Sequence, residues 1–183
     1  MKISAAVDDS LKKAQVLLLH IPNGMAIATS RAFNRSLQQG RTAATREVGK
    51  RYTVRQKDVR PTFKMRRANK SNMEAELLST GKRLPLTKFS YKPKQDTTGS
   101  NRKQVRVGVK KGGLKPLGAS FVWNGKIMQR LGKESYPIQQ KFGAAVPVMM
   151  NNNEITDRVT ETMTQSVIRR LDHETQRLLE GNK

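Results

Sequence analysis

The chain contains no cysteine and only two histidines. The absence of cysteine excludes disulfide bonds and thiolate-bound metal sites. His20 lies near the expected end of a helix, and His173 lies in a polar Asp-His-Glu stretch. Neither histidine has other ligand residues at the spacing that metal sites use. We therefore expect no metal and no cofactor.

Long apolar runs are also missing. A helix that crosses a bilayer needs about 20 consecutive apolar residues, and a run such as Val16–Leu19 is far too short. Near the N-terminus, Lys2 and a short apolar run are followed by Asp8 and Asp9, unlike a secretory signal. We expect no segment to cross a membrane and the protein to remain in the compartment where it is made.

Carboxylates are scarce where the chain is most basic. Residues 31–115 hold five scattered acidic side chains, whereas a nuclease needs clustered carboxylates to bind Mg²⁺. Asp172, His173 and Glu174 are consecutive, so they cannot converge from one helix face. The chain also lacks a Walker A loop, a dinucleotide-binding glycine fingerprint, zinc-finger spacing and an RNP-type aromatic strand. We expect neither an enzyme nor a module that reads base sequence.

Positive charge dominates the composition. The chain has 36 Lys and Arg against 14 Asp and Glu, a formal net charge of +22. Residues 31–115 hold 24 basic and 5 acidic side chains, a net of +19, whereas residues 150–183 hold 5 and 6, a net of −1. Such a field favours polyanionic partners because self-repulsion would otherwise disfavour the compact state. Nucleic acid is the first expectation, and acidic protein surfaces are the second.

Apolar spacing predicts two helices in the first 50 residues. The first covers residues 11–19, with Val16 and Leu19 on its apolar face. The second is a long basic helix over residues 25–50, with a bend near Gly40 or an end near Gly49 expected because glycine weakens a helix. The apolar face of this second helix comprises Ala26, Phe33, Leu37, Ala44 and Val48.

A third helix is expected over residues 154–179. Asn151–Asn153 can cap it, and acidic side chains in its first turn complement the helix dipole. Residues 141–150 are expected to form a helical turn that is kinked or begun at Pro147. The apolar stripe of the long helix comprises Ile155, Val159, Met163, Val167, Leu171 and Leu178.

Strands are expected between the helices. Asn124-Gly125 is a strong signal for a two-residue hairpin turn between strands 119–123 and 126–130. In residues 102–110, valines alternate with polar side chains as in a half-buried strand. Further strands are expected at 62–67, 74–79 and 84–91.

These elements predict an α+β fold. We expect a mostly antiparallel sheet of about five strands, flanked by two long helices. Residues 92–103 and 110–118 are rich in Lys, Gly, Pro, Thr or Ser and are expected to be extended basic loops. Residues 1–24 are expected to form a short helix and arm, and residues 25–183 a single domain.

An ordered series of short motifs resembles the phage minor tail protein Z family, the tail completion proteins of long-tailed phages. The resemblance covers roughly residues 25–175. Its centre is Phe121, Arg130 and Pro137-Ile138. The series comprises Ala32-Phe33-Asn34-Arg35, Arg51-Tyr52, Val105–Val109, Gly118–Val122, Met128-Gln129-Arg130, Tyr136-Pro137-Ile138 and the terminal helix.

The resemblance implies a structural virion protein at the head-proximal end of the tail. Related neck and tail-tube proteins assemble as rings, most often of six copies, around the DNA channel. The implied partners are further copies of the chain and neighbouring head-tail connector, tail terminator or tube proteins, with genomic DNA in the lumen as another candidate.

Three groups of residues are candidates for these contacts. For the surface that meets DNA or an acidic partner, the candidates are Arg41, Arg46, Lys50, Arg51, Arg55, Arg66 and Arg67. For contacts to adjacent rings, the loop candidates are Lys92, Lys94, Arg102, Lys103, Lys110, Lys111 and Lys115. The motif residues, expected to pack inside the domain or between subunits, are Phe121, Trp123, Arg130, Tyr136, Pro137 and Ile138.

A second class of function fits the same charge. A free-standing nucleic-acid-binding protein of architectural or ribosomal type would also carry a large positive field. Such a protein should bind duplex DNA tightly on its own, with a steep dependence on salt. A ring component should instead self-associate or require its phage partners. A nuclease would show nicking that depends on a divalent metal.

Overall fold

The structure is a computed structural model that describes residues 5–98 and 103–181. It combines helices with short antiparallel strands and includes two long helices, which confirms the expected α+β class. The chain divides into two compact units. Unit 1 comprises Met1–Ala44, Phe63–Ser79 and Asn153–Lys183, and unit 2 comprises Thr45–Thr62 and Thr80–Asn152.

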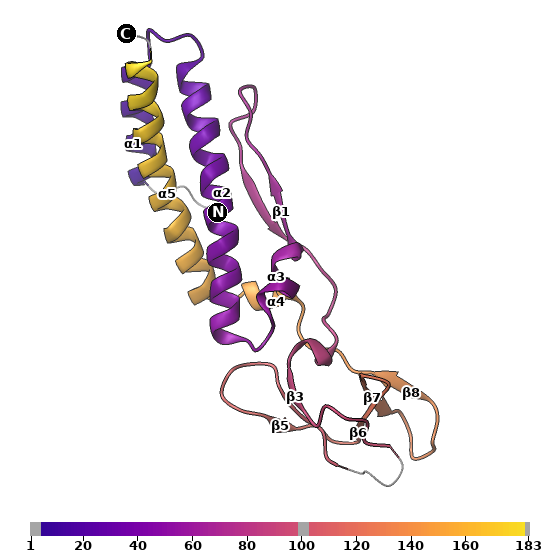
Figure 1. The fold of residues 1–183 in the computed structure, drawn as a ribbon. Helices are drawn as coiled ribbons and strands as arrows, with labels where there is room; N and C mark the ends of the chain where they lie inside the picture. Colours follow the sequence, from indigo (N-terminus) through magenta and orange to yellow (C-terminus); the bar gives the residue numbers. More distant parts are fainter. Residues whose placement is uncertain (1–4, 99–102, 182–183) are drawn as a thin grey trace. The chain divides into compact units, whose positions relative to one another are not determined.

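Unit 1 is built on three helices: α1 (Ala5–Leu17), the first part of α2 (Gly24–Arg51) and α5 (Asn153–Glu180) (Figure 1). Helix α1 packs along α5. The core cluster of unit 1 is rich in alanine, which lets its helices approach closely. Its buried members are Ala14, Leu18, Ala28, Ala32 and Leu171.

The expected apolar face of the first helix is wrong. Val16 is 74% exposed and Leu19 is 71% exposed. The helix begins at Ala5, earlier than expected, and the buried residues are Val7, Ala14 and Leu18. Their spacing of seven and four residues places them on one face.

Helix α2 is continuous from Gly24 to Arg51, so neither Gly40 nor Gly49 ends it. A Cβ atom on Gly40 would lie 2.5 Å from Sδ of Met163, which comes from α5. The glycine therefore makes room for a neighbouring side chain. One turn earlier, the hydroxyl of Ser36 donates a hydrogen bond of 2.8 Å to the Met163 carbonyl. Together these contacts fix the two long helices against each other.

A two-stranded sheet completes unit 1. Strand β1 (Phe63–Arg66) pairs antiparallel with β2 (Glu76–Ser79). After β1, the backbone of Ala68 exchanges two hydrogen bonds with the side-chain amide of Asn34, each 2.9 Å long. This exchange ties the segment after β1 to helix α2.

Unit 2 contains two three-stranded antiparallel sheets (Figure 1). Two short helices and two 3-10 turns belong to the same unit: α3 (Gln56–Val59), α4 (Val146–Met150), Arg60–Thr62 and Leu86–Lys88. The first sheet comprises β3 (Ser90–Lys92), β4 (Arg106–Gly108) and β5 (Lys115–Pro116). The second comprises β6 (Ser120–Trp123), β7 (Lys126–Arg130) and β8 (Ile138–Gln140).

The hairpin β6–β7 matches the expectation closely. Asn124 and Gly125 form its turn with φ angles of 47° and 66°, the positive values that a type I′ turn requires. The alternation in β4 is also confirmed, because Val105 and Val107 are buried while Arg106 between them is exposed.

The expected single sheet is wrong, because the described strands form three separate small sheets. The strands have only two to five residues, and turns interrupt them. The strand expected at 84–91 is instead an isolated antiparallel bridge between Pro85 and Phe142, the turn Leu86–Lys88 and then β3. The expected basic loop at 110–118 contains β5.

Candidate functional site

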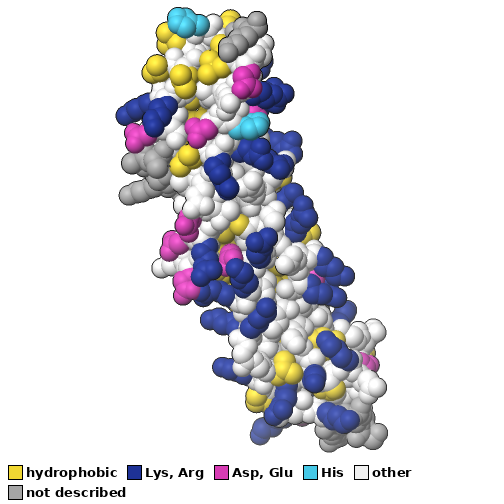
Figure 2. Space-filling view, turned by 60° about the vertical axis from the view of Figure 1, so that its left-hand side comes forward, with side chains coloured by type: hydrophobic (Ala, Val, Ile, Leu, Met, Phe, Trp, Pro, Cys, Tyr) yellow, Lys and Arg dark blue, Asp and Glu magenta, His cyan; other side chains and the backbone are white. Residues whose placement is uncertain are grey.

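The positive charge of the chain is concentrated in unit 2. This unit holds 21 basic and 4 acidic side chains, a net of +17, whereas unit 1 holds 15 and 10, a net of +5. Figure 2 shows dark blue Lys and Arg side chains spread over the visible face and far fewer magenta Asp and Glu. Unit 2 is therefore the part of the chain best suited to bind a polyanion.

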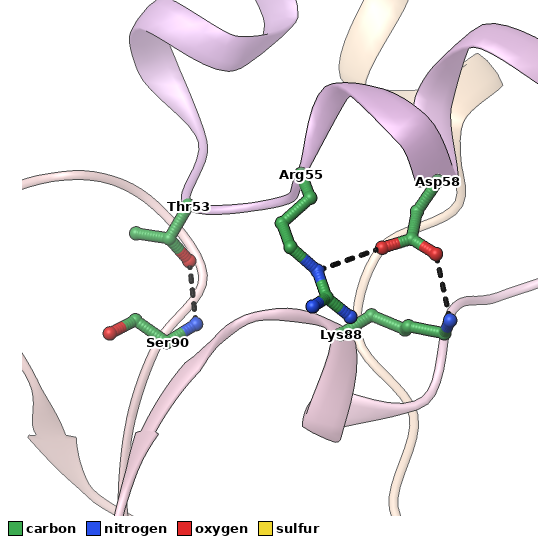
Figure 3. Close-up of polar contacts among 5 residues, drawn as sticks. All are labelled: Thr53, Arg55, Asp58, Lys88 and Ser90. Carbon is green, nitrogen blue, oxygen red and sulfur yellow. Dashed lines mark hydrogen bonds and ion pairs between the residues drawn. The ribbon is translucent and has the colours of Figure 1, made fainter.

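Thr53 joins the end of α2 to the first sheet of unit 2. Its hydroxyl oxygen accepts a hydrogen bond of 3.0 Å from the Ser90 N–H (Figure 3) and donates one to the Gly108 carbonyl. Ser90 and Gly108 are register partners on β3 and β4. One hydroxyl thus holds two strands together at the point where the helix meets them. A valine at this position would leave the Ser90 N–H without this acceptor.

Asp58 holds two basic side chains in place (Figure 3). Its carboxylate lies 2.7 Å from Nζ of Lys88 and 3.3 Å from Nε of Arg55. Burial alone would raise the pKa of Asp58, but the hydrogen bond and charge of Lys88, together with Arg55, hold this pKa below its usual value. The side chain of Asp58 is 12% exposed. Asp58 therefore positions Arg55 and Lys88 and offers little surface to a partner.

Two basic residues face each other across the first sheet. Lys92 on β3 is the register partner of Arg106 on β4, and both side chains are exposed. Directly opposed residues on antiparallel strands have Cβ atoms about 4.5–5.5 Å apart, and like charges at this separation destabilise a sheet. The next register partner of Arg106 is Pro116, which brings no compensating charge. The pair therefore costs stability and is suited to binding an anion.

Lys94 adds a cation close to Tyr91 on β3. Its Nζ lies 3.4 Å from the ring centroid of Tyr91, a cation–π contact. Burial lowers the pKa of Lys94, and the positive charge of Arg55 lowers this pKa further. This repulsion shows that Arg55 and Lys94 contribute to the same positive field.

Three more basic residues meet where α2 ends. The N–H of Lys111 donates a 2.8 Å hydrogen bond to the Arg51 carbonyl, and Lys110 forms an isolated antiparallel β-bridge with Tyr52. Lys50, one residue before Arg51, pairs with Glu47. Basic side chains in a last turn also stabilise the helix dipole, so Lys50 and Arg51 have a structural role as well. We define the cationic surface as Arg51, Arg55, Lys92, Lys94, Arg106, Lys110 and Lys111.

The seven residues that the sequence predicts for a charged surface belong to two different units. Arg41, Arg66 and Arg67 belong to unit 1, and Arg66 pairs with Glu76 at 3.3 Å. The other four belong to unit 2: Arg46, Lys50, Arg51 and Arg55. Among the loop candidates, Lys103 and Lys115 are exposed, and Arg102 lies outside the described residues.

The hairpin motif residues share one face of the second sheet. The register pairs Phe121 with Met128, Trp123 with Lys126 and Arg130 with Ile138. Because side chains alternate along a strand, these six lie on the same side. We define the sheet face as Phe121, Trp123, Lys126, Met128, Arg130 and Ile138.

Part of this motif is exposed on the surface of the chain. Trp123 is 45% exposed and Tyr136 is 72% exposed, and Pro137 and Arg130 are exposed too. The opposite side of the hairpin faces the core through Val122 and Ile127, which are 0% and 1% exposed. The sequence marked an apolar strand but did not say which face is buried, and a shift of one residue exchanges the faces. Packing between subunits stays a prediction for Trp123 and Tyr136.

The described part of the chain contains no group of three or more histidines and carboxylates that could hold a metal ion. No helix within residues 5–98 and 103–181 is long and apolar enough to cross a membrane. No family model, curated protein or solved structure matches the chain.

Sequence reasoning missed several members of the site. Asp58 and Lys88 are 30 positions apart, and no local pattern predicts their contact. No sequence pattern marks Thr53, because its hydrogen bonds are to two strands far along the chain. Lys126 and Met128 could have been found, because the hairpin turn fixes the register that places them opposite Trp123 and Phe121.

Proposed function

We propose that this protein is a structural virion protein of a long-tailed phage, a tail completion component at the head-proximal end of the tail. In this role it forms a ring around the DNA channel, in the family's usual number of six copies, and joins the tail to the head. The ordered motif series from the basic helix to the terminal helix supports this proposal.

The charge of unit 2 is the observation that carries the proposal. A protein at a DNA channel meets a dense array of phosphates and must hold or pass it without reading its sequence. Binding of this kind relies on Lys and Arg contacts to phosphate, which release counterions and are independent of sequence. The net charge of +17 in unit 2, with Lys92 and Arg106 opposed on an exposed sheet, has this character.

Exposed apolar side chains support a role in assembly. Single exposed apolar residues are ordinary, but large aromatic side chains in exposed positions are enriched at protein interfaces. Neighbouring rings and adjacent subunits are the partners proposed for these positions and for the basic loops. The large apolar side chains exposed on unit 2 are Trp123, Leu131, Tyr136, Phe142 and Val148.

Locating the protein in particles tests this function. We would attach a small affinity tag to the chain, label phage particles with an electron-dense probe and image them by electron microscopy. Label at the head–tail junction is the expected result. Particles without label, together with tagged protein bound to cellular nucleic acid, would overturn the proposal.

The same charge favours one other function, a free-standing protein that coats nucleic acid. The purified protein would then bind duplex DNA tightly without partners, and the logarithm of its binding constant would fall steeply with the logarithm of salt concentration. The two functions differ in where the protein resides, so particle labelling together with a salt titration separates them.

A further inference from the structure

The sheet face of β6–β7–β8 is open in the structure and has a mixed character. Trp123 and the two basic residues are exposed, while Phe121, Met128 and Ile138 are half-buried. The strands themselves, Ser120–Trp123, Lys126–Arg130 and Ile138–Gln140, contain no Asp or Glu. The face therefore offers apolar contact area bordered by positive charge, and no negative charge of its own.

Arg130 is held in a defined position on this face. Its guanidinium carbon lies 4.8 Å from the ring centroid of Phe121, a cation–π contact. This contact restricts where the guanidinium lies on the face, and its N–H groups form a planar fork. This fork matches the two oxygens of a carboxylate and is pre-organised to bind them.

The composition of the face favours a protein partner over nucleic acid. Duplex DNA presents phosphates, which would leave the apolar side chains of Met128 and Ile138 uncovered. Single-stranded nucleic acid stacks its bases on open aromatic rings, but Arg130 already covers one side of the Phe121 ring. Trp, Phe, Met and Arg together are instead the residue types enriched where proteins meet.

We propose that the sheet face docks an acidic, apolar segment of a partner protein. A carboxylate of that segment pairs with Arg130, a second acidic group lies near Lys126, and apolar side chains cover Phe121, Met128 and Trp123. The occupant is identified by charge complementarity, since a net charge of +17 on unit 2 selects against basic partners. This inference deepens the proposed function, and it rests on that function for the identity of the partner as a neighbouring ring protein.

Selection from a random peptide display library tests the chemistry of the occupant. The library is selected on the full-length protein and depleted on the variant Arg130→Ala. Peptides that combine Asp or Glu with apolar residues are the expected outcome. The strongest of them is then synthesised and titrated against the protein, with emission from Trp123 as the signal. Trp123 is the only tryptophan in the chain and lies on the face itself, so it reports binding at this position.

Variants of the face and a matched control sharpen the test. Arg130→Ala should weaken peptide binding about 10-fold to 100-fold, in line with the loss of hydrogen bonds to a charged group. Arg130→Lys should also weaken it, because lysine keeps the charge but lacks the fork. Met128→Glu should repel an acidic peptide. Lys82→Ala removes an exposed positive charge of unit 2 that belongs neither to the face nor to the loop candidates, and it should leave binding unchanged.

Several outcomes would overturn the inference. They are a library that yields no peptide dependent on Arg130, a selected consensus without acidic residues, and a single-stranded thymidine oligonucleotide that binds at Trp123 more tightly than every selected peptide. Each leaves particle labelling unaffected. Label at the head–tail junction with a failed selection would refute the docking face alone, and a successful selection without label would refute the virion location alone.

Discussion

The opposed pair Lys92 and Arg106 allows a prediction in which stability and binding change in opposite directions. Replacing either residue with glutamine removes a like-charge contact across the strands β3 and β4. Cross-strand pairs contribute about 0.2–1 kcal/mol, and like charges directly opposite are destabilising. The double variant Lys92→Gln/Arg106→Gln should therefore raise the free energy of unfolding of unit 2 by an amount in this range. Urea unfolding followed through Trp123, which belongs to unit 2, measures it.

The same double variant should bind polyanions less well. Each phosphate contact adds about 0.9 to the negative slope of the logarithm of the binding constant against the logarithm of salt concentration. If Lys92 and Arg106 each contact one phosphate, the double variant should lose about 1.8 of that slope. Fluorescence anisotropy of a labelled DNA duplex, titrated at several sodium chloride concentrations, measures this difference. A residue that serves folding alone would not give a more stable protein with weaker binding.

A lysine on the other unit provides the matched control. Lys64 is exposed on β1 and lies opposite Leu78, so its replacement with glutamine relieves no like-charge contact. Lys64→Gln should change neither the stability of unit 2 nor the slope by a comparable amount. The reasoning is refuted if the double variant is less stable than the parent protein, or if its salt slope equals that of the parent.

Three further substitutions test the contacts that position the site and the core. Asp58→Asn should lower the free energy of unfolding of unit 2 by about 1.5–3 kcal/mol at neutral pH, the usual range for hydrogen bonds to charged groups. Because the folded pKa of Asp58 is lowered, this stabilisation is present above the unfolded pKa and is lost as pH falls through the folded pKa, below about 4. Urea unfolding at several pH values should therefore show that the difference in free energy of unfolding between the parent protein and Asp58→Asn disappears in acid. A difference that stays constant with pH would contradict the role given to the Asp58 carboxylate. Thr53→Val should cost about 0.5–1.5 kcal/mol, the net contribution of an ordinary hydrogen bond, because the Ser90 N–H loses its acceptor. Urea unfolding measures this too, and an unchanged midpoint would show that the contact is dispensable. Gly40→Ala should destabilise unit 1 by about 1–3 kcal/mol in thermal unfolding, because its Cβ would overlap Met163. Combining it with Met163→Ala should cost less than the sum of the two single changes, and strict additivity would show that the two positions are not coupled.

The long helices and the hairpin could be predicted because their signals are local. Ile155, Val159 and Met163 recur at helical spacing, and all three are buried on α5. Asn124-Gly125 requires nothing beyond its own backbone preferences to form the turn of β6–β7. Signals of this kind depend on neighbours along the chain and not on the rest of the fold.

The features that could not be predicted depend on distant partners. Val16 and Leu19 are larger and more apolar than Ala14, yet Ala14 is buried because a small side chain allows close helix packing. Trp123 has the largest side chain of β6, yet the register of the strand places Val122 in the core. The strand patterns also do not predict three separate sheets. Each described ladder joins strands that are consecutive in the chain, and no local pattern marks that β2 does not pair with β3 or β5 with β6.

Charge and apolar surface in unit 2 make different demands on a partner. Four acidic side chains cannot neutralise 21 basic ones, whichever pairs they form, so the unit retains its repulsion until negative charge arrives from outside. Phosphate can supply this charge, but salt screens such contacts and they leave the sheet face uncovered. An acidic protein segment supplies charge to Arg130 and covers Phe121 and Met128, and salt does not screen the apolar part of that contact. A ring component at a DNA channel would meet both kinds of partner at once, which is why the two surfaces together favour an assembly over a protein that acts alone on DNA.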